Sequence, residues 1–334
     1  MHYVPKGYSS KTTLRETETA IKLIKDYFEN SLAKKLNLTR VSAPLFVLPE
    51  TGLNDNLNGV ERPVSFSGIG TQDRKCEVVQ SLAKWKRMAL KRYQFGTGEG
   101  LYTDMNAIRC DETLDNIHSI YVDQWDWEKV ISRDERTIDT LKNTVNKIYE
   151  VFLDTEQFVG SRFALFEAKL PREVTFITSQ ELAELYPELS AKDREAALVR
   201  EKGAIFIMQI GHKLLNGERH DGRAPDYDDW SLNGDLILYH KLLDIAFEVS
   251  SMGIRVDAEA MDRQLTEADA DDRRELPYHQ DVLKDRLPLT IGGGIGQSRI
   301  CMYFMDKVHI GEVQASIWED DMLEYMTEKG IVIL

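Results

Sequence analysis

The chain has 334 residues, of which 42% are hydrophobic and 29% are charged, and its formal net charge is -14. A chain of this length can bury roughly three-quarters of the surface that its unfolded form exposes, so a large core is available. The negative charge disfavours a general attraction to nucleic acid or anionic lipid, and a polyanionic ligand would need a local basic site. The longest apolar runs, such as residues 204–210, are far shorter than the roughly 20 residues that span a bilayer.

The ends and the cysteines of the chain predict a cytoplasmic protein. The first residues lack the basic and apolar regions of a signal peptide. Cys76, Cys110 and Cys301 are widely spaced and form no CxxC or Cys/His cluster, so we expect reduced thiols inside core segments and no zinc site. Because no long linker, repeat or low-complexity tract interrupts the chain, residues 1–334 are expected to form a single catalytic domain.

The first predicted element is an amphipathic helix over residues 12–36. Apolar side chains recur in it at three- and four-residue spacing: Ile21, Ile24, Phe28, Leu32 and Leu36. A short strand over residues 38–47 is expected to follow. Its Pro44 cannot donate to a central ladder, which indicates a sheet edge or an interface.

The remaining elements favour a sheet with flanking helices. Residues 100–109 and 117–127 alternate in character around a polar connection, which predicts an antiparallel hairpin. An apolar stripe over residues 133–158 predicts a helix laid on the sheet. Further strands are expected at 174–178, 203–210, 235–240 and 247–256, and further helices near 190–201 and from Ser298 onward. Without regular βαβ alternation, these signals indicate an α+β fold with an antiparallel sheet.

Two arginines stand in settings that suit a phosphate ligand. Arg109 lies in AIRCDE (107–112) at the end of an alternating segment, and Arg299 closes the glycine run GGGIGQSR (292–299) before an apolar stretch. Arginine is permanently cationic and presents a planar fork of donors, so ATP is the natural candidate ligand. An isolated Arg-x-Asp-Glu turn is more often a solvated ion-paired turn, however, and most glycine runs are merely turns.

Other polar residues have equally plain alternatives. Asp123 and Asp126 stand among Trp125 and Trp127, so they could form one exposed face of a strand whose tryptophans are core. Asp228 and Asp229 could be loop charges, and residues 268–275 a solvated turn. Four histidines without metal-ligand spacing are expected to be structural or on the surface: His118, His212, His220 and His309.

Together, these segments resemble the three motifs of class II aminoacyl-tRNA synthetases of the aspartate type: a proline after a long first helix, an Arg-x-Asp-Glu turn between antiparallel strands, and a glycine-rich strand that enters a helix through arginine. Over most of its length the chain resembles the ammonia-dependent asparagine synthetase family, the aspartate–ammonia ligases that share this catalytic core. Long, specific phrases carry that resemblance: SLAKWKR (81–87), YVDQWDWE (121–128), APDYDDW (224–230), SSMGIRVD (250–257) and IGGGIGQSR (291–299).

The resemblance implies formation of L-asparagine, AMP and pyrophosphate from L-aspartate, ATP and ammonia through a β-aspartyl adenylate. By family position, Arg109 grips the α-phosphate and acyl oxygen, and Arg299 reaches the γ-phosphate and stacks on adenine. The glycines from Gly292 to Gly296 would let the backbone approach the nucleotide. Further ATP contacts are implied for Glu112, Asp228, Ser251 and Gly294. Magnesium, which takes one or two carboxylates plus phosphate and water, is assigned to Asp235 and Glu248.

The resemblance also implies an aspartate pocket. Lys86 and Arg255 match cations for the carboxylate that is not activated, and Ser81 can donate a hydrogen bond. Asp123, Gln124 and Asp126 are assigned to the α-ammonium group. Asp55, in LNDNLNG (53–59), is assigned to binding ammonium and accepting its proton, because only neutral ammonia can attack. A glutamine-hydrolysing enzyme would need an activated cysteine, and residue 2 is histidine, so free ammonia is the expected nitrogen donor.

Two departures from the family pattern accompany these expectations. The family has a longer loop where Ser231 alone joins Trp230 to residues 232–235. Either this chain lacks the loop, which would affect closure over the nucleotide, or residues are missing from the sequence here. No module for binding a tRNA anticodon fits before the first strand. A homodimer is implied, because the Pro44 motif lies at the dimer interface in the family.

Two other classes of function stay open at this point. The first is an aminoacyl transferase acting on tRNA or on a protein lysine, which the charge and the missing module disfavour. The second is a catalytically inactive sensor of aspartate or asparagine. Retention of Arg109, Glu248 and Arg299 argues against a sensor, which would not need to grip phosphate.

Overall fold

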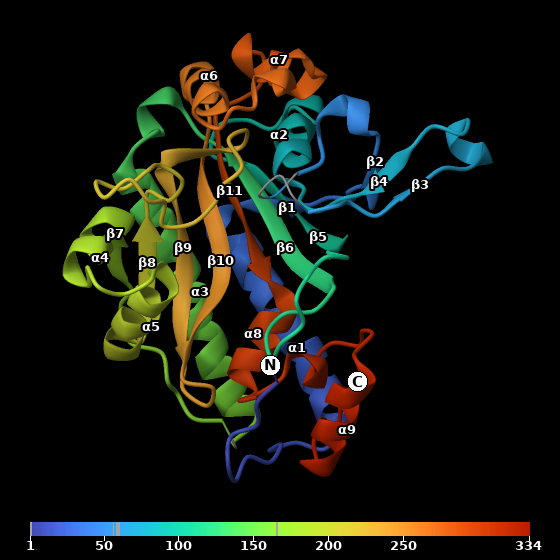
Figure 1. Ribbon diagram of the computed structural model, residues 1–334, viewed down its shortest axis with the longest axis vertical. Coiled ribbons are helices and arrows are strands. Elements are labelled where there is room, and N and C mark those ends of the chain that lie inside the picture. Colours follow the sequence, from blue (N-terminus) through green and yellow to red (C-terminus); the bar gives the residue numbers. More distant parts are fainter. Residues whose placement is uncertain (1, 56, 58–60, 165) are drawn as a thin grey trace.

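The computed structural model describes residues 2–55, 57, 61–164 and 166–334. Within them, an eight-stranded sheet has the order β1-β5-β6-β11-β10-β9-β8-β7 (Figure 1). In that order its strands are Leu38–Arg40, Gly100–Ile108, Tyr121–Val130, Thr290–Gly296, Ile245–Arg255, Asp228–His240, Ala204–Met208 and Thr175–Thr178. A small sheet of order β2-β4-β3 projects from one side of the molecule (Figure 1) and consists of Phe46–Val47, Cys76–Val78 and Ser65–Phe66.

The large sheet is antiparallel except at its two edges. β1 pairs with β5 in parallel, and β7 pairs with β8 in parallel. The predicted antiparallel sheet is thus confirmed for the five inner pairs, and only the two outermost pairs are parallel. Parallel neighbours need a long crossover, and between β7 and β8 the helices α4 (Ser179–Leu185) and α5 (Ala191–Lys202) supply it.

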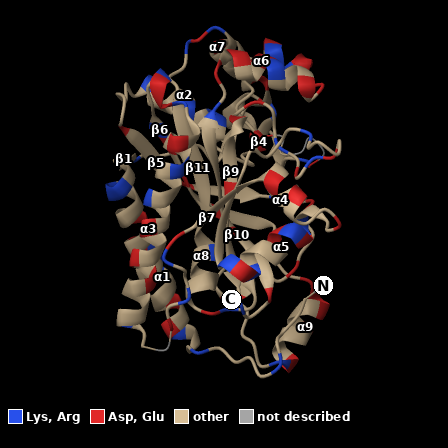
Figure 2. Ribbon diagram, turned by 90° about the vertical axis from the view of Figure 1, so that its left-hand side faces the viewer, with Lys and Arg blue, Asp and Glu red and all other residues tan. Residues whose placement is uncertain are grey.

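Helices cover both faces of the sheet. α1 (Leu14–Leu36) and α3 (Ile138–Arg162) lie together on one face, and α4 and α5 lie on the other (Figure 2). The remaining helices are α2 (Ala83–Arg92), α6 (Ala258–Glu267), α7 (Pro277–Leu283), α8 (Gln297–Phe304) and α9 (Asp320–Glu328). Short 3-10 turns span Pro49–Thr51, Ile69–Thr71, Arg133–Glu135, Asp271–Glu275 and Ile310–Glu312.

Local chemistry fixes the ends of α1. The Thr13 side chain accepts from the backbone of Glu16 while the Glu16 side chain accepts from that of Thr13, a reciprocal cap that satisfies otherwise unpaired amides. Asn37, in the left-handed conformation at φ 61, ends the helix. Between these caps, Ile24 and Phe28 are fully buried. The predicted helix over residues 12–36 is thus confirmed.

The buried stripe of α1 gives a stability prediction. Ile24→Val removes one methylene group from a fully buried position, and we expect it to lower the free energy of unfolding by about 1 kcal/mol. Urea denaturation measures this loss. The same change at Ile317, which is 76% exposed, serves as the control. Equal stability of the two variants would contradict the packing assigned to Ile24.

Alternation along β6 decides which side chains face the helices. Trp125 and Trp127 are fully buried, and Trp125 stacks on Phe28 of α1 with ring centroids 4.9 Å apart. Because successive side chains of a strand point to opposite faces, Gln124 and Asp126 lie on the other face. The tryptophans are therefore core, and their polar neighbours are free to build a site.

The other predicted elements agree with the structure in part. The hairpin is confirmed as β5 and β6, and the helix over 133–158 is α3, which begins at Ile138. The single strand over 38–47 is wrong, because β1 and β2 belong to different sheets and Pro44 lies between them. Residues 229–235 are part of β9, which runs without a break from Asp228 to His240.

Candidate active site

A cavity of about 1150 Å³ opens on the face of the sheet that carries Gln124 and Asp126. It brings together side chains from segments far apart in the sequence. Every site residue predicted from the sequence lines it: Asp55, Ser81, Lys86, Arg109, Glu112, Asp123, Gln124, Asp126, Asp228, Asp235, Glu248, Ser251, Arg255, Gly294 and Arg299. The two arginines therefore share one cavity and do not lie on separate faces.

The two arginines differ in how fully they are paired. Arg109 directly follows β5; its Nη1 lies 3.8 Å from Glu112 Oε2, and its buried Nε has no hydrogen-bond partner in the described part of the chain. Arg299, in the first turn of α8, donates from Nη1 to Glu248 O at 2.7 Å and lies 5.8 Å from the ring of Phe247. Burial, together with the nearby Arg109 charge, lowers the pKa of Arg299 despite the Glu248 carboxylate. Both cations can thus serve one polyanion.

A buried network of ion pairs forms the floor of the cavity. Lys86 Nζ donates to Gly293 O at 3.1 Å and lies 3.0 Å from Asp126 Oδ2. Arg255 binds both oxygens of Glu128, with Nη2 to Oε2 at 2.8 Å, and also donates to Asp228. Burial opposes ionisation of Glu128, but the Arg255 charge and its hydrogen bonds outweigh burial and keep the pKa of Glu128 below its ordinary value. The two cations are fixed but already shared with internal carboxylates.

Asp123 stands apart from Gln124 and Asp126. Its Oδ2 pairs with Lys25 of α1 at 2.8 Å, and its Oδ1 accepts from Ser298 N at 3.0 Å and from Gln314 at 3.3 Å. Asp123 has the same strand parity as the tryptophans, so its carboxylate faces the helix layer even though it borders the cavity. The notion that Asp123 and Asp126 share one face is therefore wrong.

Asp55 is 2% exposed and lies in a loop. Hydrogen bonds of side chains hold this loop against the segment before α2. Asn54 Oδ1 accepts from Asp55 N at 3.0 Å and from Gln80 N at 2.9 Å, while Asp55 Oδ1 accepts from Leu57 N at 2.9 Å. Burial raises the pKa of Asp55, and the charge of Lys84 opposes that rise. The predicted loop continues into residues 56 and 58–60, which lie outside the described residues.

Asp235 and Glu248 approach the cavity from the neighbouring strands β9 and β10. Asp235 forms an ion pair with Arg223, whereas its buried Oδ1 has no hydrogen-bond partner among the described residues. Burial raises the pKa of Asp235 to about 7 against the charge of Arg223, with Glu248 adding to the rise. An unpaired buried carboxylate oxygen beside a second carboxylate suits a hard cation.

The glycine run leaves room for polar side chains of other strands. A Cβ at Gly294 would approach Asp126 Oδ1 to 2.8 Å and would also clash with Gln124. A Cβ at Gly292 would lie 2.7 Å from Arg255 Nη2 and would collide with Glu128. The absence of side chains here thus makes space for the charged floor described above.

Sequence reasoning did not assign several residues that the structure places at or beside the site. Glu128 organises the floor, Arg223 pairs with Asp235, and Lys84 pairs with Asp226 at 2.9 Å. Glu128, Lys84 and Asp226 all lie inside phrases already singled out, so charged residues among the apolar and aromatic residues of those phrases were the available signal.

The cysteines and histidines stay outside the proposed chemistry. Cys76 and Cys301 are buried, but Cys110 is exposed, so the expectation that all three are core is wrong for Cys110. Cys110 sits in the turn after β5, where its thiol donates to Arg62 O at 3.1 Å. In the described part of the chain, no group of three or more His, Cys, Asp or Glu side chains could hold a metal ion.

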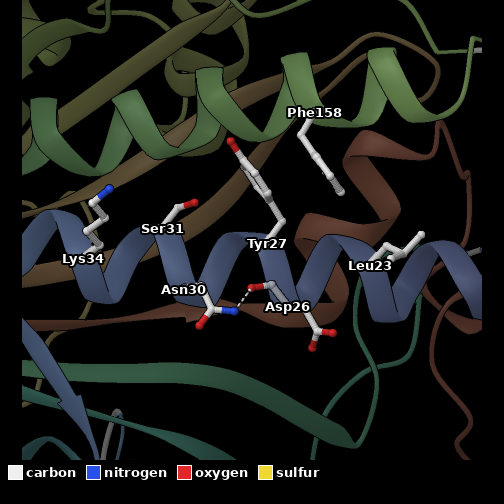
Figure 3. A pocket seen from close by; sticks show the side chains of 7 residues that line it. All are labelled: Leu23, Asp26, Tyr27, Asn30, Ser31, Lys34 and Phe158. Carbon is white, nitrogen blue, oxygen red and sulfur yellow. Dashed lines mark hydrogen bonds between the residues drawn. The ribbon is translucent and has the colours of Figure 1, made fainter.

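A second, shallower hollow of about 410 Å³ lies along α1 near Phe158 of α3 (Figure 3). Tyr27 stacks on Phe158 there with ring centroids 4.2 Å apart. Asp26 and Lys34 are charged groups in its lining, and none of the predicted site residues is among the residues that line it. The hollow is therefore unrelated to the larger cavity.

Among the described helices, none combines the length and the apolar character needed to cross a membrane.

Comparisons with known proteins agree with this geometry. The model of the aspartate-ammonia ligase family matches residues 15–330. The chain is 60% identical to the aspartate–ammonia ligase of Clostridium perfringens over 332 residues, which are 99% of this chain and 99% of that protein. It is 59% identical to the Fusobacterium nucleatum enzyme of the same name over 328 residues, 98% of this chain and 100% of that one.

Solved structures show the fold. An asparaginyl-tRNA synthetase from Pyrococcus horikoshii, complexed with asparaginyl-adenylate, matches with a TM-score of 0.64 at 14% sequence identity. The match covers 91% of this chain and 70% of that chain. The Entamoeba histolytica enzyme has a TM-score of 0.62 at 13% identity, and this chain spans 66% of it. The α+β fold is thus like that of the class II aminoacyl-tRNA synthetases. With the match to the family model, these findings show that the chain belongs to the aspartate–ammonia ligase family.

Proposed function

We propose that the chain catalyses ATP-dependent amidation of L-aspartate by ammonia, giving L-asparagine, AMP and pyrophosphate through a β-aspartyl adenylate. The observation that carries the proposal is the convergence of Arg109, Arg299 and the Lys86–Arg255 floor on one cavity in a chain of this family. ATP, aspartate and ammonia are then substrates, and asparagine biosynthesis is the pathway served.

The first half-reaction activates the side chain of aspartate. A carboxylate is a poor electrophile, so its oxygen first attacks the α-phosphorus; an O–P bond forms and pyrophosphate leaves. The attacking oxygen and the phosphate are both negative, so positive charge must be in place beforehand. Arg109, with a buried Nε that no described group satisfies, suits the α-phosphate and acyl oxygen. Arg299 suits the γ-phosphate and the adenine.

The aspartate pocket follows from the charged floor. Gln124 and Asp126 offer acceptors for the α-ammonium group, and Ser81, just before the start of α2, offers a hydroxyl. Lys86 and Arg255 provide the positive field for the free carboxylate while Asp126, Glu128 and Asp228 hold them in place. Asp123 pairs with Lys25 and accepts a hydrogen bond from the backbone N–H of Ser298. Through that hydrogen bond it supports this pocket.

The second half-reaction needs neutral ammonia. Asp55 binds ammonium and takes one proton from it; the nitrogen lone pair then forms the C–N bond as the C–O bond to AMP breaks, and the new amide nitrogen loses a second proton to solvent. A buried carboxylate at this point both attracts the cation and accepts its proton. Asp55 lines the same cavity as Arg109 and lies near enough to feel its charge, so the ammonium would lie on the side of the acyl phosphate.

Glu112, Asp228, Ser251 and Gly294 complete the nucleotide end of the proposal. Asp235 and Glu248 would hold magnesium, whose charge would neutralise phosphate oxygens, and the unpaired Asp235 Oδ1 supports that assignment. The Arg223 guanidinium, which pairs with Asp235, would share that carboxylate with the ion.

We also propose a cytoplasmic homodimer that does not act on nucleic acid. Support for a dimer comes from the small sheet beside Pro44, where Phe46 is 44% exposed and Phe66 is 42% exposed. Their rings contact each other at 5.0 Å. Exposed aromatic pairs of this kind suit a protein interface.

The experiment that tests this function is exchange of labelled pyrophosphate into ATP. We expect exchange that depends on aspartate and needs no ammonium, followed by release of AMP and asparagine once ammonium is added. Aspartate-dependent exchange without amide formation would favour an aminoacyl transferase instead, and a tRNA gel shift at low salt would then be decisive. No exchange at all would favour a sensor.

A further inference from the structure

The segment that precedes α1, residues 2–12, is tied by side chains to the turn that follows α8, and we call it the strap. Lys307 Nζ donates to Ser10 Oγ at 2.6 Å. The hydroxyl group of Tyr8 donates to Glu312 Oε2 at 2.8 Å. The strap is therefore held against the body of the protein well before α1 begins.

The strap starts beside the active-site cavity, where the side chain of Asn116 clamps the backbone of Tyr3. Tyr3 N donates to Asn116 Oδ1 at 2.8 Å, and Asn116 Nδ2 donates to Tyr3 O at 2.7 Å. Asn116 Nδ2 also donates to Val308 O at 2.6 Å, and Asn116 O accepts from Ile310 N at 2.8 Å. Asn116, which is 8% exposed, thus joins the strap, the turn after α8 and the loop between β5 and β6.

The side chain of Tyr3 is open to a ligand. Tyr3 is 55% exposed, and it lines the cavity together with Ile117 and His118, which follow Asn116 in the chain. Within the described residues its ring stacks on no other aromatic ring, and its hydroxyl group has no hydrogen-bond partner. Because the backbone of Tyr3 is already fixed at two points, a ligand that meets this ring orders little more than the side chain itself.

Hydrogen bonds connect Tyr3 with the neighbourhood of Arg299. Gln314, which lines the cavity as Ile310 does, donates to Ser298 Oγ at 3.0 Å. Ser298 is the chain neighbour of Arg299. The turn that Asn116 binds through Ile310 therefore also contacts the start of α8, and Tyr3 belongs to the end of the cavity where Arg299 lies.

The aspartate pocket lies farther along the sheet. Asn116 precedes β6, which begins at Tyr121, whereas Asp126 stands in the middle of β6 and pairs with Lys86 at 3.0 Å. At about 3.3 Å per residue, roughly 15 Å of strand separates Tyr121 from Asp126. Tyr3 is therefore placed for the nucleotide and not for aspartate.

We propose that Tyr3 is a further substrate-contacting residue: its ring, positioned by Asn116, packs against the adenosine moiety of ATP. The inference rests on the proposed function, because it takes ATP as the substrate. A tyrosine ring offers a flat, largely apolar surface on which a base can stack, and it carries no charge for the phosphates. Arg109 and Arg299 supply that charge, so Tyr3 adds affinity for adenosine alone.

The first experiment measures binding by calorimetry, without aspartate, for two probes: ATP and inorganic tripolyphosphate, each with magnesium chloride. Tyr3→Ala should weaken the binding of ATP about tenfold, the order of loss expected when a base loses an aromatic partner. Tripolyphosphate has no adenosine, so its affinity should not change. Tyr3→Phe keeps the ring and should bind ATP as the wild type does. Tyr93→Ala, the same change at a 45% exposed residue outside the cavity lining, is the control.

The second experiment tests the positioning by Asn116. Asn116→Ala releases the backbone of Tyr3, so it should also weaken the binding of ATP. The double variant with Tyr3→Ala should bind ATP about as Tyr3→Ala does, because both changes remove one and the same contact. Losses that add in the double variant would overturn the positioning role of Asn116. Should Asn116→Ala fail to fold, the two probes with Tyr3→Ala decide the role of Tyr3.

The outcomes separate this inference from the proposed function. A wild-type protein that binds ATP without aspartate-dependent pyrophosphate exchange would refute the proposed function, while the binding comparison would still test Tyr3. Unchanged affinity of Tyr3→Ala for ATP would overturn the role of Tyr3. Equal weakening of ATP and tripolyphosphate would overturn it as well, because the loss would then lie at the phosphates. In exchange assays the KM for ATP should rise with the dissociation constant, and the KM for aspartate should not.

Discussion

Asp55→Ala should reduce asparagine formation by about 10²–10⁴-fold, the usual contribution of a positioned acid or base. It should leave aspartate-dependent pyrophosphate exchange much closer to the wild-type rate. The physical reason is that the carboxylate acts on ammonium, which takes no part in forming the adenylate. Parallel assays of exchange and of asparagine release measure the two half-reactions on the same protein.

Asp55→Asn provides a matched control for the shape of this site. The amide keeps an acceptor for Leu57 N, which bonds to Asp55 Oδ1 at 2.9 Å, but it loses the charge. It should therefore be as poor as Asp55→Ala in amide formation and at least as good in exchange. Equal loss of both half-reactions in Asp55→Ala would contradict the role of Asp55.

Arg109→Ala should lower exchange itself by about 10²–10³-fold, the usual loss when one positioned donor to a developing anion is removed. Asparagine formation should fall with it, because no adenylate accumulates. Arg109→Lys should recover only part of the rate, since an ammonium group cannot present two donors in a fixed fork. The rate of exchange at saturating ATP and aspartate is the measurement.

Arg133→Ala is the control for general loss of positive charge. Arg133 is 67% exposed in its side chain and pairs with Asp285 at the surface at 3.3 Å, so exchange should be unchanged. An Arg109→Ala protein that exchanges at the wild-type rate would remove Arg109 from the chemistry and leave Arg299 as the main phosphate ligand.

Local patterns were sufficient to predict the elements that carry the site. The stripe containing Ile24 and Phe28 predicted α1, and alternation around Trp125 predicted β6, because helix and strand periods are properties of short segments. Pro44 indicated a sheet edge or an interface, and in the structure it lies between β1 and β2, which belong to different sheets. The resemblance placed Arg109 and Arg299 in one site, and in the structure both line one cavity.

Pairing between distant segments could not be read in the same way. Lys84 and Asp226 are separated by 142 residues, and nothing near Lys84 in the sequence indicates that its partner is a carboxylate rather than water. The parallel pairing of β1 with β5 likewise depends on where the sheet closes. The contacts of Asp123 with Lys25 and Ser298 join segments far apart in the sequence and could not be read from residues 121–127.

The pairing of β6 with β11 has a consequence for how the protein folds during its synthesis. Val130 lies opposite Thr290, and Gln124 lies opposite Gly296, so the middle of the sheet joins early and late parts of the chain. During synthesis, the hairpin of β5 and β6 can form before β11 has been made. Until β11 emerges, the edge of β6 that pairs with it has no partner strand, and unpaired strand edges of this kind are the sites at which incompletely folded chains associate.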